Sequence, residues 1–528
     1  MNKKVCIIGA GPSGLVTIKE LAKNNLSIKC FEKSNDIGGV FRTIENDGRS
    51  YDSLKLTVSN YFMAYSDFMP QLKENRRYWD VKEYRKYLLE YVEKNNLSKH
   101  IYTSHEVVSA FRKDNQVIVT IVNGQRRFNE TFDHLVICSG SNFEAKIPNW
   151  KNRHLFQGKI LHSSCYKNAR EFAGKNVLCI GLGESGADIV HEISQVASCN
   201  LLIRDYPNVI PRWINSFTND AYTSHCFYAM KQNGINYFMK IKAWYYLNLS
   251  RKLNKEEKLI QKWTLHRKGF MEKFFTKSDI FISDIIEHRI NLIKSEVATF
   301  TSSGILTKDG QKVEAEIIIC NTGYTTNFEH FSFGNSFVNP RKLFKQMIHP
   351  DYGSLISLIG WARPTQGGLP ACSEIQARYL SQLISGEKHL PPYGQLSKTI
   401  DKDKIYYEKL FKQSKDINSL VSYHDFMIDM ADLIGCNPKL FYWKDLSLTK
   451  KLFFGSHLPS FYRLTSPNTN KAAIDTIKSL PIAYSPRRAI FIILLILIFN
   501  PLSYLTNLFP LITQKKISFT LIKRNLPI

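Results

Sequence analysis

Hydrophobic and polar residues near the N-terminus follow the order of a strand, a helix and a second strand. Residues 5–8 form an apolar run, Leu15, Ile18 and Leu21 recur at helical spacing, and residues 28–31 form a second apolar run. A glycine-rich turn joins the first run to the helix. This order is typical of a βαβ unit with parallel strands, so the sequence predicts an α/β fold.

The same order recurs later in the chain and predicts a second domain of the same type. Residues 176–180 are apolar, Ile189, Val190 and Ile193 lie at helical spacing, and residues 201–203 are apolar again. A glycine-rich turn again precedes the helix. A chain of 528 residues is long enough for two or three domains, each with its own core.

Other segments are assigned from their patterns. Residues 82–93 predict a helix whose tyrosines face the core, and residues 105–121 and 127–138 alternate like strands. Residues 51–70 are rich in aromatic and small polar residues without a clear period, which indicates a loop lining a site. The aromatic and basic stretch 205–279 predicts inserted helices, which either cover a substrate entrance or lie on a membrane.

The turn of the first unit carries the spacing GxGxxG at Gly9, Gly11 and Gly14. Gly9 permits the tight turn, Gly11 lets a pyrophosphate approach the backbone, and Gly14 lets the helix pack against the strand. The helix N-terminus offers free N–H groups to phosphates. Glu32, at the end of the second strand, is placed to accept hydrogen bonds from a ribose. These features predict a dinucleotide site.

The turn of the second unit reads GLGESG at residues 181–186, and Arg204 stands where the first unit has Glu32. An acid at this place prefers a free 2′-hydroxyl, whereas an arginine offers a bidentate donor to a 2′-phosphate. The first unit is therefore expected to bind FAD or NAD, and the second NADPH. Alternatively, Arg204 is an exposed surface residue or pairs with the neighbouring Asp205.

Composition narrows the class of protein. The net charge of +25 suits anionic cofactors or a membrane surface, although the basic residues are spread along the chain like those of a solvated surface. We find no zinc-finger spacing and no basic helix suited to a DNA groove, so we expect no nucleic-acid partner and no metal site. The ten cysteines include no CxxC pair, which favours a reducing compartment and argues against a dithiol catalyst.

Two dinucleotide folds in one chain imply that electrons pass between two bound cofactors. A flavin is required because it accepts a hydride and then reacts with oxygen or a disulfide. Since the chain has no CxxC pair, oxygen is the expected acceptor.

Between the two turns, the sequence matches an FxGxxxHxxxY motif through Phe156, Gly158, His162 and Tyr166. The motif resembles the identifying motif of flavin-containing monooxygenases of the dimethylaniline N-oxide-forming type. The resemblance covers most of residues 4–478. In the family this motif is thought to couple cofactor movement to turnover; alternatively, His162 is a buried structural histidine.

The resemblance implies FAD in the first domain, NADPH in the second and O₂ as co-substrate. It also implies that NADPH reduces the flavin, that O₂ then forms a C4a-hydroperoxide, and that a soft nucleophile attacks it, typically an amine nitrogen or a sulfide sulfur. The alternatives are an uncoupled NADPH oxidase that releases hydrogen peroxide, a non-catalytic membrane flavoprotein, and a Baeyer–Villiger-type oxygenase. The last is disfavoured because those enzymes carry Trp where this chain has Tyr166.

The chain departs from the family at a few positions. Many members have an asparagine that contacts NADP⁺ near the flavin; Thr57 stands at that place, and Asn60 follows shortly after. Either Thr57 performs this role through its hydroxyl, or the loop shifts and Asn60 does. Phe41 replaces a usual tryptophan, and Glu184 replaces a frequent asparagine.

Position in the turns and the resemblance together give the expected site residues. Those expected to bind FAD are Gly9, Gly11, Pro12, Ser13, Gly14, Glu32, Gly39, Val40, Phe41, Thr57 and Val58. Those expected to bind NADPH are Gly181, Gly183, Ser185, Gly186, Ala187, Asp188 and Arg204. Those expected in a catalytic role are Thr57 and Asn60.

The C-terminal segment predicts a membrane contact. Residues 489–514 contain no charged residue and are flanked by paired basic residues. A spanning helix needs about 20 apolar residues, and Pro501 is expected to interrupt this one. We therefore expect a hydrophobic anchor at 485–515 that lies in one leaflet, with a bent span or a buried core helix as alternatives. The protein is then membrane-associated, with its catalytic domains on the cytosolic side.

The predicted organisation is two Rossmann-like domains, with the NADPH domain inserted in the FAD domain. The FAD domain occupies 1–155 and 321–478, the latter with a helical extension, and the NADPH domain occupies 156–320. The expected partners are a small nucleophilic substrate, O₂ and a membrane surface; formation of a homodimer is left open.

Overall fold

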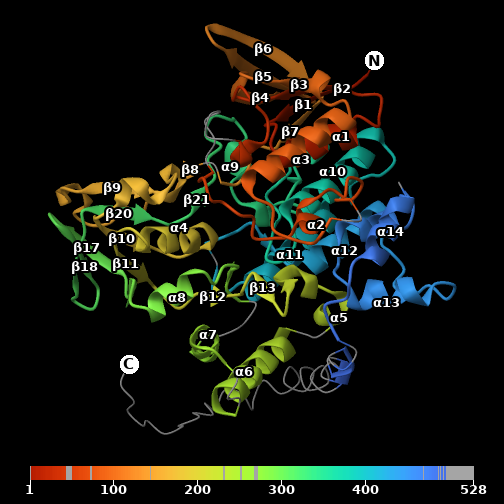
Figure 1. Ribbon diagram of the computed structural model, residues 1–528. Coiled ribbons are helices and arrows are strands. Elements are labelled where there is room, and N and C mark those ends of the chain that lie inside the picture. Colours follow the sequence, from red (N-terminus) through yellow and green to blue (C-terminus); the bar gives the residue numbers. More distant parts are fainter. Residues whose placement is uncertain are drawn as a thin grey trace.

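The structure is a computed structural model that describes residues 2–497, with gaps at 43–49, 72–73, 143, 230–231, 250–252, 267–271, 415, 468, 486, 488, 492 and 495–496. Two parallel β-sheets form the centres of two lobes (Figure 1). The predicted α/β class and the predicted pair of Rossmann-like units are confirmed.

The first sheet has the strand order β22-β7-β1-β2-β3, and all its strands are parallel. Its strands are β1 (Lys4–Ile8), β2 (Ser27–Phe31), β3 (Ile101–Tyr102), β7 (His134–Ile137) and β22 (Ile356–Leu358). Alternate residues of β1 point to opposite faces: Val5 and Ile7 join one buried cluster and Cys6 another. Helices α1 (Pro12–Leu21) and α10 (Leu369–Ser385) cover the first face.

A three-stranded antiparallel sheet covers the other face of the first sheet. It consists of β4 (Glu106–Lys113), β5 (Gln116–Asn123) and β6 (Arg126–Phe132). The prediction of one strand over 105–121 was wrong in detail, because Asp114 has φ +53° and turns the chain into a hairpin. The predicted helix at 82–93 is confirmed as α3 (Val81–Lys94), which begins with a capping box between Asp80 and Glu83.

The second sheet has the order β16-β11-β10-β20-β9 and is also parallel. Its strands are β9 (Lys159–His162), β10 (Asn176–Ile180), β11 (Ser198–Ile203), β16 (Ile290–Lys294) and β20 (Ile317–Cys320). Helices α4 (Glu184–Ser194) and α8 (Phe281–Ile286) cover one face. The other face carries the antiparallel strands β17 (Val297–Thr301), β18 (Gly304–Thr307) and β19 (Lys312–Glu314).

The chain crosses between the lobes at two adjacent points. After β7 it passes through β8 (Glu144–Ala145), and after β20 it returns through β21 (Tyr324–Thr325). These two short strands pair with each other in antiparallel orientation.

The remaining helices and strands surround the two sheets. The insertion contains short strands as well as the predicted helices: β12 (Asn208–Val209), β13 (Trp213–Ile214), β14 (Phe217–Thr218), α5 (His225–Tyr228), α6 (Gln232–Asn248), α7 (Lys255–His266) and β15 (Phe275–Thr276). The segment predicted as a loop at 51–70 contains α2 (Asn60–Met63). The other elements are α9 (Gly334–Phe337), β23 (Arg363–Pro364), α11 (Tyr393–Leu410), β24 (Leu420–Val421), α12 (Tyr423–Ile434), α13 (Leu446–Phe454), η10 (Pro459–Arg463) and α14 (Lys471–Ser479).

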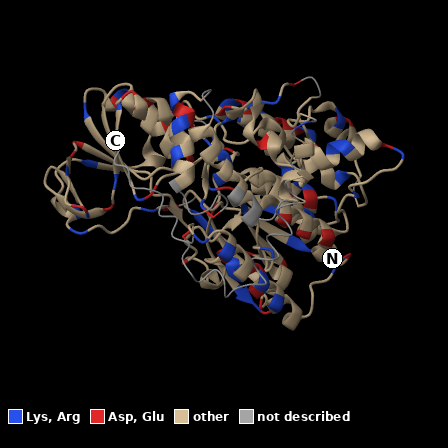
Figure 2. Ribbon diagram, turned by 90° about the horizontal axis from the view of Figure 1, so that it is seen from below, with Lys and Arg blue, Asp and Glu red and all other residues tan. Residues whose placement is uncertain are grey.

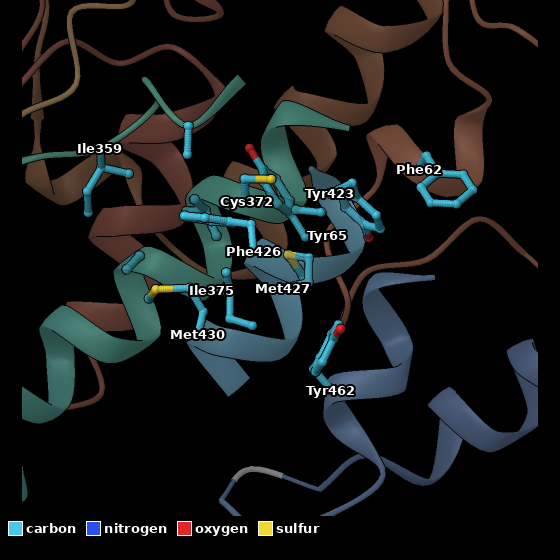
Figure 3. Packing of buried hydrophobic residues seen from close by; sticks show 14 of the residues in the cluster. Phe62, Tyr65, Ile359, Cys372, Ile375, Tyr423, Phe426, Met427, Met430 and Tyr462 are labelled. Atoms are coloured by element: carbon cyan, nitrogen blue, oxygen red, sulfur yellow. The ribbon is translucent and has the colours of Figure 1, made fainter. Parts of the chain in front are cut away.

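The C-terminal helices pack onto the first lobe through an apolar interface. Figure 3 shows Cys372 and Ile375 of α10 facing Phe426, Met427 and Met430 of α12. Burial of these side chains removes apolar surface from water and attaches the extension to the first domain.

The surface carries mixed charge. Figure 2 shows Lys and Arg interspersed with Asp and Glu over many elements. None of the helices in the described part of the chain combines the length and apolarity needed to cross a membrane. The anchor predicted at 485–515 lies largely outside the described residues.

Candidate functional site

The first glycine turn, between β1 and α1, is closed by backbone packing. Gly9 has φ +97°, and a Cβ on Gly14 would lie 1.9 Å from the carbonyl oxygen of Gly9. The fold itself therefore requires glycine at both positions. Gly11 differs, because its φ is −76° and a Cβ there meets only the backbone of Gly39, at 3.5 Å. Gly11 and Gly39 thus keep a strip of bare backbone beside the helix N-terminus, which suits a pyrophosphate.

Glu32 ends β2 and is 7% exposed. Its Oε2 accepts a hydrogen bond from the backbone N–H of Ala10 at 2.8 Å, and its Oε1 accepts one from that of Ser34 at 3.0 Å. A carboxylate oxygen has two lone pairs, so each oxygen retains an acceptor site for a ribose hydroxyl. Glu32 therefore fixes the loops on both sides of the site and has the chemistry expected of a ribose ligand.

Other residues predicted to bind FAD surround this turn. Pro12 begins α1, and Ser13 hydrogen-bonds a serine of α10. Val40 is 39% exposed, whereas Phe41 packs edge-on against Tyr84 of α3 at 4.8 Å between ring centroids. The structure therefore brings these predicted residues together at one edge of the first sheet.

In the second glycine turn, between β10 and α4, the outer glycines are again needed for packing and the middle one is not. Gly181 has φ +91°, and its Cβ would lie 2.8 Å from the carbonyl oxygen of Asn321. A Cβ on Gly186 would also meet Asn321, at 3.1 Å from Cγ. Gly183 has φ −112°, and a Cβ there would meet nothing within 4 Å. The outer glycines serve packing, and only the middle glycine faces open space.

Arg204 follows β11 and is exposed. Its neighbour Asp205 lies 3.9 Å from Nζ of Lys273 and 3.7 Å from Nζ of Lys294. Burial lowers the pKa of Lys273; Asp205 opposes this shift, whereas the positive charges of Arg204 and Lys294 add to it. Three basic side chains therefore gather at the end of β11, where a 2′-phosphate would supply compensating negative charge.

Asp188 lies in α4 and connects the two lobes. Its Oδ2 accepts hydrogen bonds from the hydroxyl of Tyr51 at 2.9 Å and from Nη2 of Arg212 at 2.8 Å. Its Oδ1 accepts one from the hydroxyl of Ser278 at 3.0 Å. Of the other predicted NADPH residues on this helix, Ser185 is exposed and Ala187 is buried.

Residues 360–363 run from one turn to the other. A Cβ on Gly360 would lie 2.4 Å from Oγ of Ser13, at the first turn. Arg363 places Nη2 3.8 Å from Oε2 of Glu184, the first residue of α4, at the second turn. The Cα atoms of residues 360 and 363 are at most about 11 Å apart, because an extended chain advances about 3.6 Å per residue. The two turns therefore lie at the ends of one short segment.

Two cations that the sequence analysis did not assign, the buried Lys277 and the partly exposed Arg363, flank the start of α4. Nζ of Lys277 lies 3.4 Å from Oε1 of Glu184, and Arg363 approaches the other oxygen. Burial lowers the pKa of Arg363, and Glu184 opposes that shift. Arg363 lies within the part of the chain that the resemblance covers, directly after the apolar residues 359–362, so its charge was an available signal; Lys277 lies in no motif.

The two candidate catalytic residues have different surroundings. Asn60 is fully buried; its Nδ2 donates to Oε1 of Glu74 at 3.1 Å, and its Oδ1 accepts from the backbone N–H of Arg77 at 3.1 Å. Thr57 is half-buried, and Val58 beside it is buried. The amide of Asn60 is therefore engaged by the protein, and Thr57 is the more accessible of the two.

The FxGxxxHxxxY motif is built into the second domain. A Cβ on Gly158 would lie 2.2 Å from the carbonyl oxygen of Glu316. The backbone N–H of Ser164 donates to Nδ1 of His162, so Nε2 of His162 carries the proton and donates to the carbonyl of Gly323 at 2.8 Å. His162 thus joins β9 to the loop after β20, beside the crossing between the lobes.

The other motif residues are packing residues in this structure. Phe156 is buried against Phe300. Tyr166 is buried, and its hydroxyl donates to Oε2 of Glu192 in α4 at 2.6 Å.

Comparisons with known proteins agree with this geometry. A family model described as flavin-binding monooxygenase-like matches residues 2–480. A 4-hydroxybenzoate brominase (decarboxylating) from Pseudoalteromonas luteoviolacea is 35% identical, with 89% of this chain and 91% of that protein aligned. A dimethylaniline monooxygenase (N-oxide-forming) from Homo sapiens is 30% identical, with 88% and 85% aligned. Among solved structures, an S-allyl-L-cysteine S-oxygenase from Allium sativum aligns with a TM-score of 0.57 at 18% identity, over 86% of this chain and 92% of that one.

Proposed function

Because this chain belongs to the flavin-binding monooxygenase-like family, we propose that its two dinucleotide folds act as one catalytic unit. The protein is an NADPH-dependent flavin monooxygenase, and its cofactors are FAD and NADPH. We assign FAD to the domain formed by 1–155 and 321–478, and NADPH to the inserted domain at 156–320.

The observation that best supports this proposal is the short segment 360–363, which reaches both turns. When bound, FAD would supply two kinds of chemistry: it can accept a hydride from NADPH, and it can then react with O₂. Glu32 would hold the ribose of FAD, and Gly11 and Gly39 would admit its pyrophosphate. Arg204 would bind the 2′-phosphate of NADPH, and the hydroxyl of Thr57 would donate a hydrogen bond on the nicotinamide side of the site.

We propose that the substrate is a soft nucleophile, with an amine nitrogen or a sulfide sulfur as the first candidate. Oxygen transfer to such an atom needs little acid or base catalysis from the protein. The chain must instead position the nucleophile and exclude water.

Bromide is the second candidate, and a specific observation favours it. The two brominase relatives are each 35% identical to this chain, against 30% for the human N-oxide-forming enzyme. Bromide is also a soft nucleophile. The reaction balances as NADPH, O₂, Br⁻ and two protons giving NADP⁺, H₂O and HOBr, since NADPH and bromide each lose two electrons and O₂ gains four. A phenol carboxylate such as 4-hydroxybenzoate would then be brominated with loss of CO₂.

The two candidates are separated by measuring NADPH oxidation with a tertiary amine, with a methyl sulfide, and with bromide plus 4-hydroxybenzoate. Mass spectrometry then identifies an N-oxide, a sulfoxide or a bromophenol. A monooxygenase acting on its substrate releases little hydrogen peroxide per NADPH. Stoichiometric peroxide under every condition would instead support the uncoupled oxidase, and a bromophenol without N-oxide or sulfoxide would reject the first candidate.

We further propose that the protein contacts a membrane through one apolar face. Helix α6 exposes Ile241, Trp244 and Tyr245, each more than half exposed. The described residues near the C-terminus add Ile490 and Phe491, and Phe491 contacts Phe238 of α6 at 6.3 Å between ring centroids. Exposed aromatic and aliphatic side chains gathered in this way suit an interfacial contact with lipid.

Vesicle flotation tests this contact. The full chain should float with vesicles, and a chain ending after residue 484 should float less. Replacement of Trp244 and Tyr245 by Ser should reduce binding further. Equal flotation of all three forms would reject the proposal.

A further inference from the structure

Three histidines from segments far apart in the sequence meet beneath the first lobe. His225 begins α5 in the insertion, His424 lies in α12, and His457 lies between α13 and η10. One ring nitrogen from each lies within 4.8 Å of the others. None of the three belongs to the residues assigned to FAD or NADPH, and their chemistry has no place in the proposed reaction.

Two of these rings have a buried nitrogen without a partner. His225 is 7% exposed and His457 is fully buried. Within the described part of the chain, Nε2 of His225 and Nδ1 of His457 form no hydrogen bond. Leaving a buried polar nitrogen unsatisfied is costly, so Nδ1 of the fully buried His457 requires an explanation such as a bound ion.

The spacings within the cluster allow a shared ion. Nε2 of His424 lies 3.0 Å from Nδ1 of His225, so Nδ1, and not the unpartnered Nε2, is the nitrogen of His225 that would face the ion. Two nitrogens bound to one zinc ion at about 2.0–2.1 Å are about 3.3 Å apart in a tetrahedral arrangement. Since one nitrogen of each ring lies within 4.8 Å of the others, side-chain shifts bring the three rings to this spacing.

Two of the rings also have a hydrogen-bond partner on the nitrogen that would not bind the ion. Nδ1 of His424 lies 3.3 Å from Oδ1 of Asp425, and Nε2 of His457 lies 2.6 Å from the hydroxyl of Tyr462. Metal-binding histidines commonly donate their second N–H to such a carboxylate or hydroxyl, which fixes the ring. Tyr462 and its neighbour Tyr423 line the same buried region in Figure 3.

We propose that His225, His424 and His457 bind one divalent transition-metal ion of the zinc class. Three imidazole ligands suit Zn²⁺ and leave a fourth position for water. The ion would attach α5 of the insertion to the C-terminal helices. This contact adjoins the first domain, because the hydroxyl of Tyr228 in α5 donates to Oε1 of Gln366, just before α10. The site is therefore structural, and it does not depend on which substrate the enzyme oxidises.

The first experiment uses tag-free, FAD-loaded protein that has been treated with a chelator and then dialysed. Titration with ZnCl₂ by calorimetry should show one equivalent bound per chain, and bound zinc should raise the melting temperature. X-ray absorption at the zinc edge should show a nitrogen-rich shell near 2.0 Å. A lack of saturable binding, or a shell of oxygen or sulfur ligands, would overturn the proposal.

Substitutions test which residues bind the ion. His424→Gln should weaken zinc binding about 100-fold, and Asp425→Asn about 10-fold or more, because it replaces the carboxylate that holds the ring of His424 by an uncharged amide. His389→Gln is the matched control, since His389 is an exposed histidine outside the cluster. FAD content shows whether each variant is folded. Asp425 is 42% exposed in its side chain, so Asp425→Asn remains informative if His424→Gln does not fold. Wild-type affinity in a folded His424→Gln variant, or in Asp425→Asn, would reject the assignment.

Discussion

At the residue scale, the two GxGxxG turns contain glycines of two kinds. Gly9, Gly14 and Gly181 are required by a positive φ or by a backbone atom where Cβ would stand. Gly11 and Gly183 have ordinary φ values and ordinary or open surroundings. The protein alone does not require glycine at these middle positions, which agrees with the proposal that they leave room for a pyrophosphate.

We predict that Gly183→Ala leaves the melting temperature unchanged and raises the KM for NADPH 10-fold or more, because the new methyl group enters the space for the pyrophosphate. The matched variant Gly181→Ala should instead destabilise the fold by about 1 kcal/mol or more, since alanine is strained at φ +91°. Thermal melts and NADPH titrations check both. A Gly183→Ala enzyme with normal KM would remove the second turn from the pyrophosphate site.

Arg204→Ala should weaken the binding of NADPH about 10- to 100-fold, which is the usual effect of losing a charge-assisted hydrogen bond. It should leave the binding of NADH unchanged. The steady-state KM for both nucleotides measures this. The control is Arg289→Ala, since Arg289 also lies in the second domain but pairs with Asp284 and Glu287. Equal losses for NADPH and NADH would exclude Arg204 from the 2′-phosphate site.

At the scale of elements, a buried ion network joins four segments of the first domain. Nη2 of Arg463, in η10, lies 2.9 Å from Oε1 of Glu20 in α1 and 2.6 Å from Oε1 of Glu374 in α10. Its Nε donates to the hydroxyl of Ser66 at 2.6 Å, and its Nη2 lies 3.6 Å from Oδ2 of Asp67. The side chains of Arg463, Glu20 and Glu374 are at most 3% exposed. The network therefore connects the helix of the first turn to the C-terminal extension.

We predict that Arg463→Met lowers the free energy of unfolding by about 3–5 kcal/mol, because it removes the ion-pair partner of the buried Glu374 and one of the cations that pair with Glu20. Chemical denaturation measures the change, and FAD retention should fall with it. The control is Lys86→Met, which breaks only an exposed pair with Glu90 on α3 and should change stability little. A stable Arg463→Met variant would show that the network is dispensable.

The same network predicts that the stability of the fold depends on pH. Burial by itself raises the pKa of Glu20, but the charges of Arg463, Lys19 and Lys23 outweigh it and hold the pKa well below its ordinary value. The unfolded chain takes up a proton at this residue near pH 4.3, whereas the folded chain stays ionised. Its contribution to stability is therefore complete above that pH and is lost as the pH falls. Glu20→Gln should show a shallower loss of stability between pH 6 and pH 3.5, measured by denaturation; an unchanged slope would contradict this assignment.

At the scale of the whole molecule, the relative position of the two lobes decides whether hydride transfer is possible. The lobes meet through Asp188 with Tyr51, through the pair β8 and β21, and through Arg363 with Glu184. All these contacts lie near the second turn or the crossing between the lobes. They fix the position of the two glycine turns relative to each other.

Asp188→Asn should slow reduction of the flavin by NADPH 10-fold or more while changing the Kd for NADPH little. The substitution weakens the contacts to Tyr51 and Arg212, so the two lobes are held less firmly. Small displacements of reacting groups greatly lower the reaction rate. Stopped-flow absorbance at the flavin band separates the rate from the affinity. The control, Ser53→Ala, removes an exposed contact between the lobes with Glu192 and should have little effect. A Kd increase without a change in rate would instead place Asp188 at the nucleotide.

The sequence by itself determined the local parts of this protein: the two βαβ units, their glycine turns, Glu32, Arg204 and the capped helix α3. Each depends on residues close together in the chain, whose spacing and chemistry are visible without a fold. Only the tertiary structure decided how Asp188 joins the lobes, how Lys277 and Arg363 flank the start of α4, and how His225, His424 and His457 come together. These contacts join residues distant in sequence, so they depend on packing that no local pattern encodes.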